Sequence, residues 1–178
     1  PNDVIAAPDG AIWFTDPPFG TYAFYEGLKV EAELPHTHVY RIDGQSGEIS
    51  LVADDIDHPN GLAFSPDENI LYIIESRSEP RNILAFDVAG GKTLTKRRVF
   101  YGCKPGETPD GFRVDVDGNL WCGWGMGTAE LDGVMIFSPA GKPIGRIALP
   151  ERCANVCFGG RNRDRLFMAA SKSLYAIY

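Results

Sequence analysis

The fold is decided by a stretch in the middle of the chain, PNGLAFSPDENILYII, which occupies residues 59–74. The stretch begins at Asn60-Gly61, continues as a short apolar run, turns over residues 66–69 and ends in the apolar residues 71–74. Asn-Gly and Pro-Asp steps form turns, whereas short runs rich in Ile, Tyr and Phe favour strands. The stretch therefore predicts a turn that opens on Asn60, followed by two antiparallel strands joined by a hairpin.

The same arrangement occurs three more times. The equivalent motifs are Pro1-Asn2-Asp3-Val4, Pro109-Asp110-Gly111-Phe112 and Ala154-Asn155-Val156-Cys157. Their Asn or Asp residues, taken with Asn60, are 58, 50 and 45 residues apart. Blades of four antiparallel strands repeat every ~40–50 residues in propellers. The sequence therefore predicts an all-β protein, a β-propeller with four-stranded blades.

We expect a single propeller domain over residues 1–178, with repeats that begin near residues 1, 58, 108 and 153, and few helices. Further strands are predicted over residues 37–42, 48–53, 82–88, 94–100, 133–138 and 143–149. Because the chain begins on the inner strand of one repeat and ends on the second strand of another, we expect it to be part of a larger propeller that lacks its N-terminal portion here.

The first interval is the longest, and residues 16–35 in it have no clear strand or helix period. This insertion carries Phe19, Tyr22, Phe24 and Tyr25. It either covers the mouth of the channel or is a plain structural loop.

Composition excludes several classes of function. Apolar residues make up 44% and charged residues 23% of the 178, as in ordinary globular proteins. No apolar run approaches the ~18 residues that span a bilayer, so no membrane segment is expected. The net charge of −7 disfavours nucleic acid as a partner, since phosphate binding needs a basic surface. The four cysteines lack zinc-ligand spacing, and the sequence leaves a disulfide, the compartment and the oligomeric state open.

The motif residues Asn2, Asn60, Asp110 and Asn155 are candidates for a site. Inner strands of a propeller run along the central channel, so residues at one register form a ring around its mouth. Amide and carboxylate oxygens suit hard cations such as Ca²⁺, Mg²⁺ or Mn²⁺. The alternative is that these residues only start turns. The aspartates of the following hairpins are assigned to turn structure, and Trp13, Trp121 and Trp124 to the core between blades.

Three ordered runs carry a resemblance to a known family. They are PNDV…PDG…IWFTDP, HPNGLAFSPD and PDGF…DVDGNLW. With them the chain resembles the gluconolactonase branch of the SMP-30/gluconolactonase/LRE-like family, over essentially all its residues. The resemblance implies a six-bladed propeller that opens sugar lactones with one divalent cation, Ca²⁺ first, with Mg²⁺, Mn²⁺ and Zn²⁺ as alternatives.

The resemblance also implies residue roles. Asn60 and Asp110 match metal ligands, and Asp110 matches the general acid/base. Asn2 and its neighbour Asp3 match the substrate-contacting Asn-Asp motif. A further metal-binding Glu of the family has no counterpart in this chain, which begins after it.

The expected chemistry agrees with these roles, because Asp110 is the one carboxylate in the predicted ring and can move a proton. The predicted function is metal-dependent hydrolysis of a small-molecule sugar lactone. Two alternatives stay open: another metal-dependent esterase, such as a paraoxonase-like or phosphotriesterase-like enzyme, and a non-catalytic propeller that binds a ligand or partner.

Overall fold

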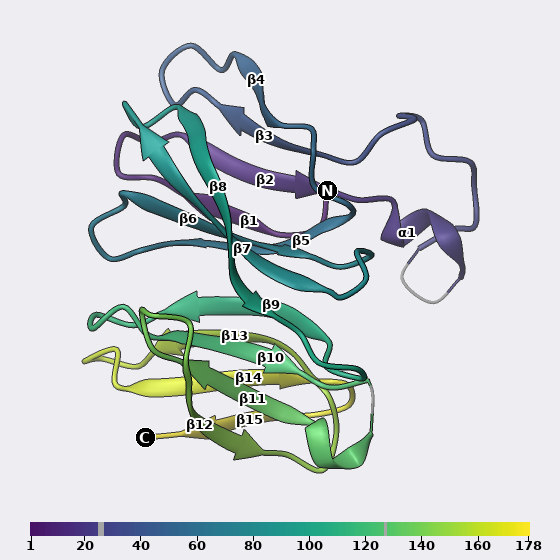
Figure 1. Cartoon of the computed structure of the whole chain (residues 1–178), viewed down its shortest axis with the longest axis vertical. Helices are drawn as coiled ribbons and strands as arrows, with labels where there is room; N and C mark the ends of the chain where they lie inside the picture. Colours follow the sequence, from purple (N-terminus) through teal and green to yellow (C-terminus); the bar gives the residue numbers. More distant parts are fainter. Residues whose placement is uncertain (25–26, 127) are drawn as a thin grey trace.

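Four antiparallel sheets follow one another along the chain, the first two in the upper half of Figure 1 and the last two in its lower half. The computed structural model describes residues 1–24, 27–126 and 128–178. The first sheet has the order β1 (Val4–Ala6), β2 (Ile12–Asp16), β3 (His38–Ile42) and β4 (Ile49–Ala53). The second has β5 (Pro59–Phe64), β6 (Ile70–Glu75), β7 (Asn82–Ala89) and β8 (Thr93–Gly102).

The two C-terminal sheets repeat this meander. The third sheet contains β9 (Pro109–Val114), β10 (Leu120–Trp124), β11 (Gly133–Phe137) and β12 (Pro143–Ala148). The fourth has three strands, β13 (Cys153–Gly159), β14 (Arg165–Ala170) and β15 (Leu174–Ile177). The first strands of successive sheets, β1, β5, β9 and β13, contact one another in order. This arrangement confirms the predicted all-β propeller, and the predicted strands correspond to the observed ones within two residues at each end.

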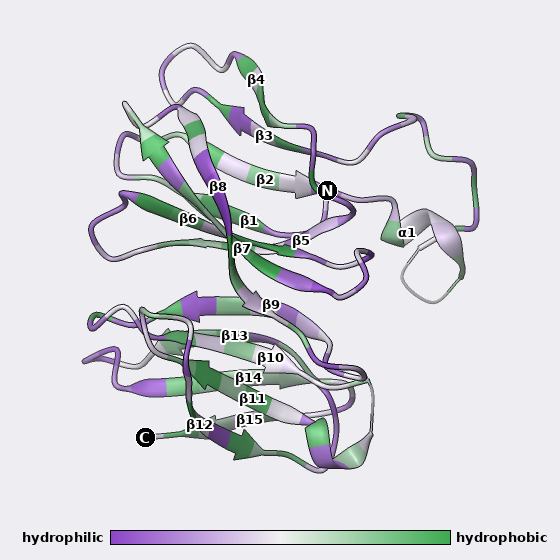
Figure 2. Ribbon diagram, in the orientation of Figure 1, coloured by the Kyte–Doolittle hydropathy of each residue, from purple (hydrophilic) through white to green (hydrophobic). Residues whose placement is uncertain are grey.

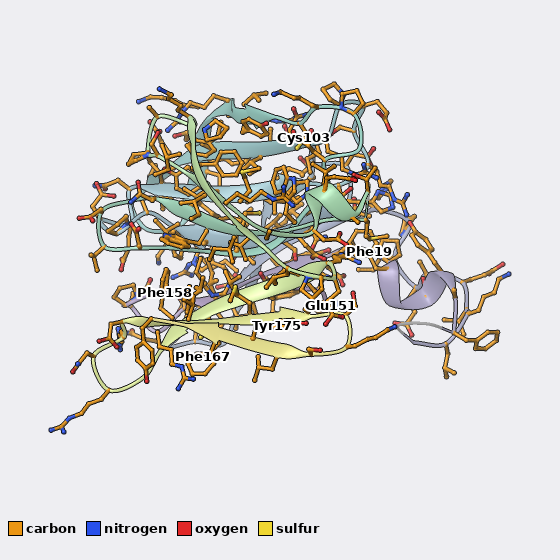
Figure 3. All side chains as sticks on the ribbon, turned by 90° about the horizontal axis from the view of Figure 1, so that it is seen from below. Phe19, Cys103, Glu151, Phe158, Phe167 and Tyr175 are labelled. Carbon is orange, nitrogen blue, oxygen red and sulfur yellow. The ribbon has the colours of Figure 1, made fainter. Side chains whose placement is uncertain are left out.

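Each core cluster lies between two successive sheets. Strand β6 shows why: Leu71 and Ile73 pack toward the first sheet, whereas Tyr72 and Ile74 pack toward the third. Since both faces of an inner blade are covered, its middle strands, such as β6, are apolar on both faces and show no polar alternation. Figure 2 shows β6 and β11 as largely hydrophobic, and Figure 3 shows side chains filling the spaces between the sheets.

The structure confirms the assignment of the three tryptophans to the core between blades. Trp13 and Trp124 are fully buried, and Trp121 is partly buried with its indole N–H donating to Asp115 Oδ2 at 2.9 Å. The cysteines are unpaired in the structure: Cys103, Cys122 and Cys153 are buried and Cys157 is exposed.

Helices are few in the described part of the chain. The helix α1 (Phe19–Tyr22) lies in the insertion, and a 3₁₀ turn spans Ala129–Leu131. Neither is long and apolar enough to cross a membrane. Tyr25, which the sequence groups with the aromatic residues of the insertion, lies outside the described residues.

The prediction that Asn60 and Asp110 open turns is wrong. Both residues lie inside strands, in β5 and β9. Pairing explains the difference, because Pro59 is opposite Glu75 and Leu62 is opposite Ile73, so Asn60 and Gly61 together face one residue of β6. Such a two-against-one arrangement is a β-bulge, which bends a strand and redirects a side chain. The Asn-Gly and Asp-Gly steps therefore form bulges.

Candidate functional site

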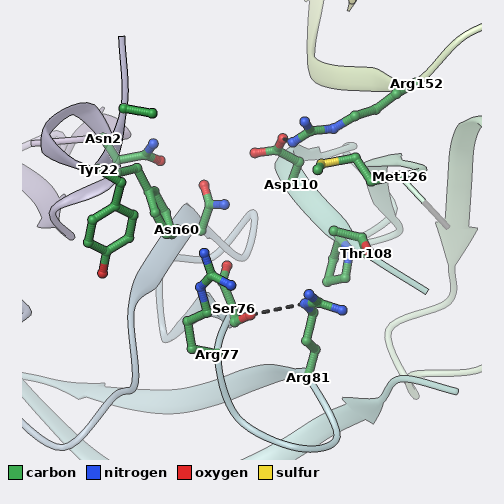
Figure 4. Close-up of a pocket in the computed structure, with 13 residues that line it drawn as sticks. Asn2, Tyr22, Asn60, Ser76, Arg77, Arg81, Thr108, Asp110, Met126 and Arg152 are labelled. Carbon is green, nitrogen blue, oxygen red and sulfur yellow. Dashed lines mark hydrogen bonds and ion pairs between the residues drawn. The ribbon is translucent and has the colours of Figure 1, made fainter. Parts of the chain in front are cut away.

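A pocket of about 290 Å³ opens at the end of the sheets where the first strands begin. Its wall is built by residues from loops and strand starts of all four sheets (Figure 4): Asn2, Phe19, Tyr22, Ala23, Asn60, Ser76, Arg77, Arg81, Thr108, Pro109, Asp110, Met126 and Arg152. The structure thus brings together three of the predicted residues, Asn2, Asn60 and Asp110.

The bulges explain how these three side chains reach one pocket. In β9, Pro109 is opposite Trp124 and Phe112 is opposite Cys122, so Asp110 and Gly111 share one partner. At the start of β1, the backbone of Thr15 bonds both Asn2 N–H and the Asp3 carbonyl, at 2.8 and 3.1 Å. The irregularity therefore recurs at the same register in successive sheets. Each time it places the first residue of the bulge at the pocket.

Asn155 does not hold the register that the sequence suggested. In β13, Cys153 is opposite Ala170 and Val156 is opposite Met168, so the two bulge residues are Ala154 and Asn155. The first bulge residue, Ala154, is therefore the equivalent of Asp110. Asn155 instead corresponds to Gly111. Its carboxamide accepts Val156 N–H at 2.8 Å and lies where a Cβ on Gly111 would be. The predicted ring of four is therefore corrected to three residues, because alignment on the Asn displaced the fourth repeat by one residue.

The glycines of the motifs let the inner strands approach one another. A Cβ on Gly61 would lie 2.7 Å from the Asp110 carbonyl oxygen and 3.1 Å from Gly111 Cα. Real Cβ atoms essentially never come so close to backbone. Asn60 and Asp110 are therefore carried by strands that can pack together only if Gly61 has no side chain.

Asp3 is placed beside the pocket wall and is not among the described residues that line it. Its carboxylate is buried, accepts Val4 N–H at 2.8 Å and Leu62 N–H at 3.4 Å, and lies 3.7 Å from Arg113. These contacts connect β1 to β5 and β9. A contact between Asp3 and substrate stays a prediction.

Asp110 is the one carboxylate in the described wall of the pocket, and it is paired with Arg152. Its other oxygen accepts the Gly111 N–H at 3.1 Å. Burial raises the pKa of the Asp110 carboxyl above its ordinary value, although Arg152, Gly111 N–H and the Asn60 side chain act to lower it. The backbone around Arg152 is attached to the last sheet: its carbonyl accepts Ser171 N–H at 3.1 Å, and the adjacent Glu151 accepts Tyr175 O–H at 3.0 Å and Lys172 N–H at 2.7 Å. Figure 3 shows Glu151 beside Tyr175.

Three arginines of the wall were not found from the sequence. Arg152 comes directly before β13, and Thr108 and His58 hold the same place before β9 and β5. Thr108, like Arg152, lines the pocket. The position directly before each inner strand recurs in the sequence, and this recurrence could have identified Arg152 as a candidate. Arg77 and Arg81 lie in the loop between β6 and β7, where no periodicity marks them.

The inserted helix contributes Phe19 and Tyr22 to the wall, so the insertion does shape the pocket. The Tyr22 hydroxyl is hydrogen-bonded to His58 Nε2, and His58 Nδ1 lies 2.6 Å from Asp57 Oδ1. Phe19 also packs on the His58 ring, with centroids 5.8 Å apart. These contacts attach the insertion of the first sheet to the second.

The donor set fits a hard divalent cation on one side. Figure 4 shows Asn2, Asn60 and Asp110 directed toward the same space, and their oxygens are of the type that Ca²⁺ or Mg²⁺ prefers. Two of the three are amides, and among the described residues no group of three or more His, Cys, Asp or Glu side chains is placed to hold a metal ion. Asn60 and Asp110 would supply part of a coordination shell, with Arg152 on the outer side of the carboxylate.

The chain is similar in sequence and in fold to known proteins. The chain is 30% identical to a gluconolactonase of Zymomonas mobilis, over 99% of this chain and 49% of that protein. It is 31% identical to bovine (Bos taurus) regucalcin over 67% of this chain and 39% of that protein. The solved structure of a Xanthomonas campestris gluconolactonase superimposes with a TM-score of 0.87 and 40% identity, over 99% of this chain and 56% of that one.

The chain thus spans about half the length of the gluconolactonases that it matches. The SMP-30/Gluconolactonase/LRE-like region is matched over residues 1–172, nearly the whole sequence. On this evidence, the chain belongs to the SMP-30/gluconolactonase/LRE-like family.

Proposed function

We propose that the protein hydrolyses a sugar-type lactone in the pocket that contains Asp110, Asn60 and Asn2. The observation that carries the proposal is the bulge in β9, which places the Asp110 carboxylate in the pocket wall beside two amides. Relatives named gluconolactonases support the substrate class at the level of the family.

We propose one divalent cation as cofactor, held by Asn60 and Asp110, with Ca²⁺ as the first candidate. When bound, such an ion polarises an ester carbonyl and offsets the negative charge that develops on its oxygen. Neutral amides such as Asn60 and Asn2 can bind and orient groups but do not act as bases near pH 7.

Asp110 would move the proton in the reaction. Its carboxylate accepts a proton from the attacking water as the water oxygen bonds to the carbonyl carbon. The bond from that carbon to the ring oxygen then breaks, and the same proton passes to the ring oxygen, which leaves as a hydroxyl group. Asn2 would orient the lactone from the opposite wall, and Arg152 would hold Asp110 in position.

The test is hydrolysis of glucono-δ-lactone by the protein with Asp110→Asn, with and without a chelator. Removing a general acid/base costs about 100-fold or more, so we expect at least that loss in kcat. Asp117→Asn is the matched control, because Asp117 is an exposed carboxylate in the turn after β9. It should leave kcat unchanged.

The outcomes separate the parts of the proposal. An active Asp110→Asn variant would contradict the catalytic role, and full activity in chelator would contradict the cation. Hydrolysis of aryl esters or phosphotriesters in place of lactones would favour the other metal-dependent esterases. Ligand or partner binding without any hydrolysis would favour a non-catalytic propeller.

A further inference from the structure

We propose that Arg77 and Arg81 form an anion-binding subsite, and that the substrate is a lactone with a carboxylate or phosphate group remote from its carbonyl. That the substrate is a lactone rests on the proposed function, whereas the binding of an anion by the two arginines does not. Both arginines lie in the β6–β7 loop and line the pocket on the side away from Asp110 (Figure 4).

The charges of the wall give the first argument. The chain has a net charge of −7, yet the described wall carries three arginines and one carboxylate. Arg152 is paired with Asp110, whereas no salt bridge to Arg77 or Arg81 is present among the described residues. Two guanidinium groups at one end of a pocket create a field that favours an anion there.

The geometry of Arg81 gives the second argument. Its Nε donates to the Ser76 carbonyl at 3.0 Å, and its own carbonyl accepts Cys103 N–H at 2.9 Å. The guanidinium is therefore oriented before any ligand arrives. Its terminal nitrogens make no hydrogen bond with the described residues. A fixed guanidinium of this kind suits bidentate binding of a carboxylate or phosphate.

The loop that carries both residues is well supported. Ser76 N–H and Arg77 N–H donate to the carbonyls of His58 and Asp57, at 3.2 and 3.4 Å. The buried Glu75 carboxylate accepts Asn82 Nδ2 at 3.0 Å at the start of β7. Ser76 Oγ is also buried, and within the described structure it has no hydrogen-bond partner, which is unfavourable unless a ligand or water supplies one. The loop thus holds an incompletely paired polar group next to the two arginines.

The experiment compares kcat/KM for a neutral lactone, glucono-δ-lactone, with kcat/KM for 6-phosphogluconolactone and glucarolactone at constant ionic strength. We expect the anionic substrates to be preferred about 10-fold or more. Arg77→Gln and Arg81→Gln should each lower this ratio about 10-fold, the lower end of the range of one hydrogen bond to a charged group. The phosphate and carboxylate substrates distinguish the two possible anions.

Arg161→Gln is the matched control, since Arg161 is exposed in the turn between β13 and β14. It should leave the ratio unchanged. Arg77 makes no side-chain hydrogen bond with the described residues, so its variant tests the subsite even if Arg81→Gln fails to fold. Hydrolysis of the neutral lactone with no preference for the anionic ones, or a ratio insensitive to both substitutions, would overturn the subsite and leave the lactonase proposal intact.

A second readout covers the case in which no lactone is hydrolysed. Inorganic phosphate is titrated into the chelated protein by calorimetry, so that no cation contributes to binding. Binding that weakens at least 10-fold in both arginine variants would support the subsite while the lactonase proposal fails. Absent binding, or equal binding in all variants, would overturn the subsite.

Discussion

Asp110 and Arg152 depend on each other. The side chains are 15% and 22% exposed, so the pair is largely removed from water. A buried carboxylate is unfavourable when it loses a charged partner, and this penalty exceeds the net contribution of the intact pair. Arg152 thus has a stabilising role through Asp110, in addition to lining the pocket.

We expect Arg152→Gln to lower the free energy of unfolding by about 1–3 kcal/mol, because it leaves the Asp110 carboxylate without its cationic partner. In an Asp110→Asn background the same substitution should cost little. Urea unfolding of the four proteins in chelator measures this double-mutant cycle. Equal losses in both backgrounds would show that the two side chains do not interact in solution.

At the level of the strands, the bulge is the device that makes the site. It turns Asn2, Asn60 and Asp110 toward one pocket, while Asp3, Gly61, Gly111 and Asn155 fill the next position. Of these, Gly61 and Gly111 make room for the neighbouring inner strand, and Asp3 and Asn155 reach across to it. The first residue of each bulge therefore provides the candidate chemistry, and the second residue determines how closely the inner strands pack near the axis.

Gly61→Ala should lower the free energy of unfolding by about 1–3 kcal/mol, since overpacking forces backbone shifts between β5 and β9. It should also weaken activity, because Asn60 and Asp110 move with these strands. Gly102→Ala is the control: it lies in β8, and its Cβ would meet nothing closer than Asn82 Oδ1 at 3.8 Å. Denaturant unfolding and kcat/KM measure both effects, and equal stability of the two variants would contradict the close approach.

At the level of the whole molecule, stability comes from the apolar side chains that are buried between neighbouring sheets. The cluster between the second and third sheets contains Phe112, Trp124 and Phe137, all at most 1% exposed. The outer strands β4, β8, β12 and β15 are by contrast largely exposed. Each blade therefore depends on its neighbours for a hydrophobic core, as in other repeat architectures.

The reactivity of the four cysteine thiols depends on whether each is buried between the sheets. Burial raises the pKa of Cys103 to about 12 and of Cys153 to about 11, and that of Cys122 is also raised. Between pH 7 and 9 these three remain protonated as well as covered, and both conditions suppress reaction, since the thiolate is the nucleophile. We expect a disulfide reagent at pH 8 to modify Cys157 alone in the native protein and all four thiols in urea. Fast modification of two or more native thiols would mean that the spaces between sheets open.

Local chemistry in the sequence was enough to predict much of this protein. Turn residues and β-branched runs at a recurring spacing determined the strands, and the repeat determined the propeller, because four-stranded sheets of this size must stack to bury their faces. The recurrence of Asn or Asp also predicted that Asn2, Asn60 and Asp110 lie together. Only the tertiary structure decided the rest. Bulges displaced Asn155 by one residue, since register depends on cross-strand pairing, and loops far apart in sequence brought Arg77, Arg81 and Arg152 to the same pocket.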